Sequence, residues 1–126
     1  MKKDSGIDAK LVYVGTMDQL AEVTCLRVNV LFRGAVDSVL VVHYQGEVRA
    51  YRNLCVHMPR ALDCEGSQVF DQAQGYLRCS MHGIVYSPED GESLSDICRG
   101  KKLTAVRVRE IEQHIYLDDR RVKAVP

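Results

Sequence analysis

Two stretches decide the fold and the site of this chain: Asn53-Leu54-Cys55-Val56-His57 and Leu77-Arg78-Cys79-Ser80-Met81-His82-Gly83. They contain a Cys-x-His pair and a Cys-x-x-His pair, separated by 21 residues. Two thiolates and two imidazoles at such short spacings are typical ligands of a metal. Structural zinc usually takes a Cys-x₂₋₄-Cys pair and a His-x₃₋₅-His pair, and the chain contains neither. One Cys and one His in each stretch instead suit a two-iron cluster whose two irons take different ligands.

The two stretches resemble the cluster-binding loops of the Rieske iron-sulfur family. The resemblance covers about residues 39–117, and its weaker matches are Tyr86, Asp90-Gly91 and Cys98-Arg99-Gly100 followed by Leu103. It implies an all-β fold, in which an antiparallel β sandwich or barrel forms the base and a smaller cluster-binding subdomain is inserted into it.

The resemblance also implies a cofactor and its ligands. Cys55 and Cys79 would hold one iron of a Rieske-type 2Fe-2S cluster, and His57 and His82 would hold the other, with one cluster per chain. The alternative interpretation is that the chain contains two unrelated Cys/His pairs. No residue is expected to be catalytic.

The length of 126 residues predicts one domain, residues 1–126, with the cluster-binding insertion at about residues 52–91. In Rieske-type oxygenases, a much larger domain with a mononuclear iron follows the cluster domain, and this length leaves no room for one. The remaining histidines, His43 and His114, are expected to be ordinary strand residues. We therefore expect an electron-transfer protein, not an enzyme.

The charge balance excludes several classes of partner. Seventeen basic and seventeen acidic residues cancel, and no basic stripe indicates nucleic-acid binding. We expect Lys101-Lys102 and Arg120-Arg121 to be solvated charges. No apolar segment follows Lys2-Lys3 as in a signal peptide, and no apolar run is long enough for a spanning helix. A cytoplasmic protein without membrane contact is therefore expected.

Five cysteines, an odd number, do not suggest a secreted disulfide framework. If two of them bind iron, we expect Cys25, Cys64 and Cys98 to be small buried or half-buried thiols. High-potential respiratory members of the family carry two extra cysteines that clamp the cluster loops with a disulfide. Arg60 and Met81 occupy those positions, so the clamp is absent.

Short β-branched or alternating segments, separated by turn residues, dominate the chain outside the ligand region. They predict strands at residues 11–15, 26–32, 39–44, 48–51, 76–78, 103–109 and 114–117. Gln45-Gly46-Glu47 predicts a hairpin between two of these strands, and residues 17–23 predict one short helix.

The residues around the ligands indicate a low reduction potential. Ile84 stands where respiratory members have a serine that donates to a bridging sulfide, and Pro59 removes one backbone N–H. Tyr86 stands where those proteins have a tyrosine that donates to a cysteine sulfur, although a simple packing role is equally open. We expect a potential of about −150 to +50 mV, the lower half of the family range.

These observations favour a soluble Rieske-type ferredoxin that carries single electrons from a reductase to a terminal oxygenase or another oxidoreductase. Two alternatives stay open. One is a non-catalytic Rieske subunit fixed within a larger oxidoreductase complex, and the other is a zinc-binding structural module. The colour of the purified protein separates the zinc module from the iron proteins.

Overall fold

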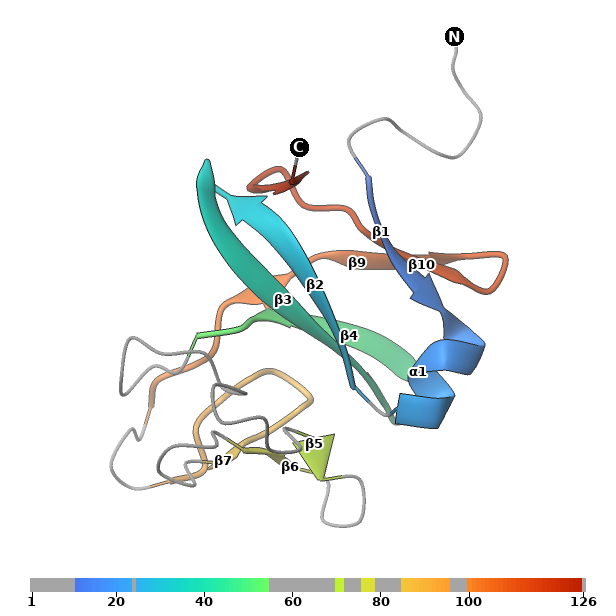
Figure 1. The fold of residues 1–126 in the computed structure, drawn as a ribbon. Helices are drawn as coiled ribbons and strands as arrows, with labels where there is room; N and C mark the ends of the chain where they lie inside the picture. The colour runs from blue at the N-terminus through green and yellow to red at the C-terminus, as the bar shows by residue number, and fades with distance from the viewer. Residues whose placement is uncertain are drawn as a thin grey trace, which may run out of the picture.

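The computed structural model describes residues 11–23, 25–54, 70–71, 76–78, 85–95 and 100–125. Their strands form three antiparallel sheets (Figure 1). The first sheet has the order β1-β10-β9, with bounds Val12–Thr16, His114–Leu117 and Val108–Ile111. The second has the order β11-β2-β3-β4-β8, with bounds Val122–Ala124, Cys25–Phe32, Ala35–Tyr44, Glu47–Arg52 and Ala105–Val106. The third has the order β5-β6-β7, with bounds Phe70–Asp71, Tyr76–Arg78 and Val85–Tyr86.

The main hydrophobic core lies between the first and second sheets, which together form the base of the molecule. Ile115 and Leu117 from β10 join Val30 of β2 and Val39 and Val41 of β3 in one cluster, and all five are fully buried. Alternation along each strand sends these apolar side chains to the same face. The expected all-β antiparallel fold is confirmed, and the base that carries the third sheet is the first two sheets packed together (Figure 1).

Two-residue turns join the hairpins of the base. The expected turn between β3 and β4 is confirmed as Gln45-Gly46, and both residues have positive φ, 51° and 82°. Such left-handed pairs match the twist of the flanking strands. The turn between β9 and β10 has the same sign of φ at Glu112 (50°) and Gln113 (72°), although neither is glycine.

The expected helix over residues 17–23 is confirmed as α1 (Met17–Val23). Its first turn is fixed by a reciprocal pair of hydrogen bonds: the Gln19 N–H donates to Thr16 Oγ1 (3.1 Å), and the Thr16 N–H donates to Gln19 Oε1 (2.9 Å). This is a capping box, which satisfies N–H groups that a helix start otherwise leaves unpaired. The Met17 N–H donates to the Gln113 carbonyl (2.9 Å), which fixes α1 to the β9–β10 turn.

The expectation of one strand at residues 103–109 is wrong. The chain instead forms β8 next to β4 in the second sheet and then β9 next to β10 in the first sheet, and Arg107 lies between the two strands. The physical reason is the carboxylate of Asp119, which accepts the Arg107 N–H (3.1 Å) where the chain passes from one sheet to the other.

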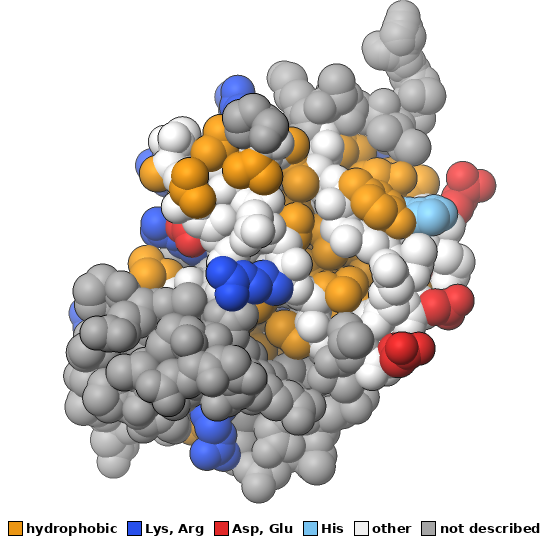
Figure 2. Space-filling view, in the orientation of Figure 1, with side chains coloured by type: hydrophobic (Ala, Val, Ile, Leu, Met, Phe, Trp, Pro, Cys, Tyr) orange, Lys and Arg blue, Asp and Glu red, His pale blue; other side chains and the backbone are white. Residues whose placement is uncertain are grey.

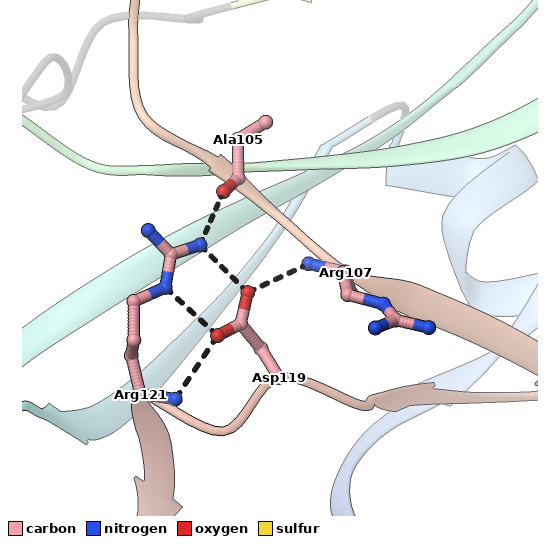
Figure 3. Close-up of polar contacts among 4 residues, drawn as sticks. All are labelled: Ala105, Arg107, Asp119 and Arg121. Carbon is pink, nitrogen blue, oxygen red and sulfur yellow. Dashed lines mark hydrogen bonds and ion pairs between the residues drawn. The ribbon is translucent and has the colours of Figure 1, made fainter.

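Asp119 is the centre of a polar network at this crossing (Figure 3). Its side chain is 5% exposed and also accepts the Arg121 backbone N–H (3.0 Å), Nε (2.9 Å) and Nη2 (2.7 Å). The same Nη2 donates to the Ala105 carbonyl (2.8 Å). The Arg121 side-chain bonds hold the pKa of Asp119 well below its ordinary value. The prediction that Arg121 is a solvated charge is therefore wrong, because it pairs with a buried carboxylate.

Candidate metal centre

The four predicted ligands, Cys55, His57, Cys79 and His82, lie outside the described residues. Their assignment as ligands therefore stays a prediction. The structure does describe the strands from which both ligand-bearing segments leave, and the strand to which the second segment returns.

The second ligand-bearing segment connects two paired strand ends. In the β6–β7 ladder, Leu77 pairs with Tyr86 and Arg78 pairs with Val85. Residues 79–84, which include Cys79 and His82, therefore begin and end at neighbouring positions of one antiparallel pair. We call the strand ends that hold such a segment its root. Because these two ends lie side by side, they limit how far apart two donor side chains on the connecting segment can lie.

The far side of β7 is fixed as well. The Val85 N–H donates to Ser95 Oγ (3.1 Å), and the Leu94 N–H donates to the Val85 carbonyl (2.8 Å). Tyr86, next along the strand, is 0% exposed. The hydrogen bond that the resemblance implies from Tyr86 to a cysteine sulfur involves residues outside the described part, and it stays a prediction.

The first ligand-bearing segment begins at the end of β4 on buried hydrogen bonds. Asn53, two residues before Cys55, is 2% exposed. Its N–H donates to the Ser38 carbonyl (2.9 Å), and its Nδ2 donates to Ser38 Oγ (3.0 Å). The neighbouring Arg52 N–H donates to the Thr104 carbonyl (2.8 Å). The backbone that leads to Cys55 is therefore held by β3 on one side and by the segment before β8 on the other.

Both segments are inserted between adjacent strands of the base. Tyr51 of β4 pairs with Ala105 of β8, so the chain leaves the second sheet after β4 and returns to the neighbouring strand. The third sheet lies within this excursion, at the lower left of Figure 1. This confirms the expected base with an inserted part, and the expectation that the inserted part carries the metal ligands stays a prediction.

Sequence reasoning missed Tyr51. Its side chain is 2% exposed, and its hydroxyl donates to the Pro88 carbonyl (2.7 Å), 37 positions later in the chain. Burial raises the pKa of Tyr51 to about 12. A tyrosine within a short strand of mixed charged and uncharged residues gives no local signal of such a bond, because its partner belongs to another element.

Three arginines surround the ring of Phe32, the last residue of β2. The guanidinium carbons of Arg52, Arg121 and Arg33 lie 4.6, 5.2 and 6.0 Å from the centroid of the Phe32 ring. Arg52 also forms an ion pair with Asp37, as Arg121 does with Asp119. These carboxylates offset the repulsion between neighbouring positive charges, and cation–π contact stabilises the group further.

The remaining predicted residues divide into two groups. Cys25 is half-buried at the start of β2, as expected. His43 lies in β3 and His114 lies in β10, also as expected. The Tyr13 hydroxyl is 3.0 Å from Nδ1 of His114. Lys101, Lys102 and Arg120 are exposed, as expected. The following lie outside the described residues: Cys64, Cys98, Pro59, Arg60, Met81 and Ile84.

The sequence is neutral overall, but charge is distributed unevenly on the face that Figure 2 shows. Figure 2 shows acidic side chains along the edge formed by α1 and the β9–β10 hairpin, and basic side chains mainly on the opposite side.

Within the described ranges, no group of three or more His, Cys, Asp or Glu side chains is placed to hold a metal ion. No helix in the part of the chain that the structure describes is long and apolar enough to cross a membrane.

A base of two antiparallel sheets, with a third, smaller sheet inserted between two adjacent strands, defines a class of all-β domains. Within this class, the sequence matches the Rieske [2Fe-2S] domain over residues 10–107. The chain therefore belongs to the Rieske [2Fe-2S] domain family. A comparison with curated proteins finds no match.

Solved structures share this fold. The ferredoxin of carbazole 1,9a-dioxygenase from Nocardioides aromaticivorans IC177 is 24% identical, with a TM-score of 0.68 over 88% of this chain and 99% of the ferredoxin. The terminal oxygenase of carbazole 1,9a-dioxygenase from Novosphingobium sp. KA1 is 20% identical (TM-score 0.68), and the match covers 96% of this chain but 31% of the oxygenase. A plasma membrane Rieske protein from Synechocystis PCC 6803 is 22% identical, with a TM-score of 0.63 over 85% of this chain and 98% of its own.

Membership of this family implies a 2Fe-2S cluster as the cofactor, as expected from the sequence, and the zinc alternative is set aside. The residues fit this group. Cys55 and His57 follow a strand end fixed by buried hydrogen bonds, and Cys79 and His82 lie between two paired strand ends. Each of the two segments thus contains one cysteine and one histidine, and together they supply the donor set of a Rieske centre.

Proposed function

We propose that this chain is a Rieske-type ferredoxin, which carries one electron at a time from a reductase to a terminal oxygenase or another oxidoreductase. The match to a ferredoxin over 88% of this chain and 99% of that chain is the observation that carries the proposal. The oxygenase, in contrast, has more than two thirds of its length outside the match. A cytoplasmic location fits this function and is part of the proposal.

Under this proposal, the protein itself performs no chemistry on a substrate. The 2Fe-2S cluster supplies the one-electron couple, and the chain holds it and tunes its potential. Cys55 and Cys79 would bind one iron, and His57 and His82 the other. An imidazole that binds iron through one ring nitrogen keeps the second for proton exchange, so His57 and His82 would couple electron transfer to pH.

The ligand set is tested by single substitutions. Cys55→Ser, His57→Ala, Cys79→Ser and His82→Ala should each abolish or alter the visible and EPR spectra of the anaerobically purified protein. Cys25→Ser is the matched control, since Cys25 lies in β2 of the base, and it should keep two irons per chain. An unchanged spectrum in any of the four variants would remove that residue from the site.

The electron-carrier role is tested with a purified reductase and a purified terminal oxygenase from the same organism. The reduced protein, mixed with the oxidised oxygenase, should lose one electron per chain within the turnover time of the complete system. A protein that binds the cluster but does not speed substrate oxidation when added to its reductase and oxygenase would contradict this role.

A further inference from the structure

Tyr51 connects the base to the inserted part through a buried hydrogen bond. Its backbone belongs to the second sheet, where it pairs with Leu40 of β3 and Ala105 of β8. Its side chain points out of that sheet, and its hydroxyl donates to the Pro88 carbonyl (2.7 Å). Both partners are buried, since Tyr51 is 2% exposed and Pro88 is below 2%.

The segment that receives this bond is a tight turn directly after β7. The Gly91 N–H donates to the Ser87 carbonyl (2.7 Å), and the Ser87 N–H donates to the Glu92 carbonyl (2.9 Å). Gly91 has a φ of +80°, and a Cβ there would lie 2.9 Å from Tyr51 Cε1. The absence of a side chain at Gly91 therefore lets the Tyr51 ring pack closely against the turn.

The two ends of this contact lie near the two ligand-bearing segments in the sequence. Tyr51 precedes Cys55 by four residues, and Pro88 follows His82 by six. β4 and β7 belong to different sheets, so no strand pairing joins them. A rigid buried bond between these two points limits how far the roots of the two segments move relative to one another.

We propose that Tyr51 is a positioning residue for the cluster, and that its hydroxyl fixes the spacing between the Cys55/His57 segment and the Cys79/His82 segment. The inference rests on the proposed function, because it takes these four residues as the ligands. A ligand set supplied by two separate segments is sensitive to this spacing, since both irons share ligands from both roots.

The test compares Tyr51→Phe with the wild-type protein, both loaded with the cluster. The substitution keeps the ring and removes one donor, which leaves the buried Pro88 carbonyl without its partner. We expect two irons per chain, altered g values in the EPR spectrum of the reduced protein, and a shifted midpoint potential. Loss of the cluster to a chelator should be faster by roughly 5- to 30-fold, the factor that corresponds to one unsatisfied buried group.

Two control variants separate positioning from general destabilisation. Ile115→Val removes one methyl from the core between the first two sheets, where Ile115 is 0% exposed, so it weakens the fold away from the inserted part. Tyr44→Phe removes a hydroxyl at the half-buried end of β3, next to the β3–β4 turn and away from the turn after β7 that receives the Tyr51 bond. Both should keep the wild-type g values and potential.

The outcomes are distinct. If Tyr51→Phe has the g values, potential and chelator sensitivity of Ile115→Val, Tyr51 only packs and the inference is refuted. If Tyr51→Phe does not load, Gly91→Ala decides, because its methyl group would displace the Tyr51 ring: altered g values support the inference and wild-type values overturn it. A wild-type protein without a Rieske spectrum would refute the proposed function as well.

Discussion

Replacing Asp119 with alanine should destabilise the fold more than the same substitution of the neighbouring Asp118. The substitution removes the acceptor of four hydrogen bonds, two from backbone N–H groups and two from the Arg121 guanidinium. The Asp119 side chain is 5% exposed, whereas that of Arg121 is 33% exposed, so the guanidinium regains part of its hydration.

The magnitude follows from these contacts. Removing one partner of a fully buried ion pair costs about 3–5 kcal/mol, and the partial exposure of Arg121 reduces this value. The two backbone donors add about 0.5–1.5 kcal/mol each. Because the terms overlap in one network, we expect a total loss of about 2–4 kcal/mol in the free energy of unfolding.

Urea unfolding of the cluster-loaded protein, followed by far-UV circular dichroism, measures this loss, since the chain contains no tryptophan. Asp118→Ala is the matched control. Asp118 is 3.6 Å from Arg109 with both side chains well exposed, 37% and 50%, so its loss should cost about 0–0.5 kcal/mol. If the two variants differ by less than about 1 kcal/mol, the Asp119 network does not hold the crossing between the sheets.

Three further perturbations have defined outcomes. Because the pKa of Asp119 is lowered in the folded state, the carboxylate stabilises the fold above its unfolded pKa of 3.8, and this stabilisation is lost as the pH falls. Asp119→Asn should therefore flatten the decline in the free energy of unfolding in urea between pH 5 and pH 3. The same decline in the variant and the wild-type protein would contradict this. Gln113→Gly should stabilise the fold by on the order of 0.5–1 kcal/mol in the same assay, because Gln113 has a φ of 72°, while a loss of stability would point to a side-chain role for Gln113. Thr16→Ala should cost about 1 kcal/mol through loss of the capping box at α1, and Thr16→Ser should restore it; equal stability of both variants would exclude capping.

The base could be predicted where local pattern and tertiary structure agree. β3 and β4 follow from their apolar residues and from Gln45-Gly46, whose short turn sets the pairing of Tyr44 with Glu47. The crossing at Arg107 could not be predicted, because Val106-Arg107-Val108-Arg109 alternates as one strand would. What divides it is a carboxylate 12 positions away, whose burial depends on the packing of the two sheets.

The same contrast applies to the site. The Cys-x-His and Cys-x-x-His pairs are local, so their type and spacing are visible in the sequence. The contact between Tyr51 and Pro88 joins residues 37 positions apart, and neither has a distinctive neighbourhood. Arg121 follows Asp118-Asp119-Arg120 in a charged run that resembles a solvated turn, and only the fold shows that Asp119 and Arg121 face inward together.

The closure of the inserted part has a consequence for how the domain tolerates change. The Arg52 N–H meets the Thr104 carbonyl, and Tyr51 pairs with Ala105, so the base holds both ends of the excursion side by side. The entropy of closing a chain segment grows only with the logarithm of its length, about 0.6 kcal/mol for each doubling. Closure by itself therefore tolerates a change in the length of the connecting loops at small cost, whereas the buried contacts of Tyr86 and Pro88 restrict such changes to loops that leave the third sheet and its turn in place.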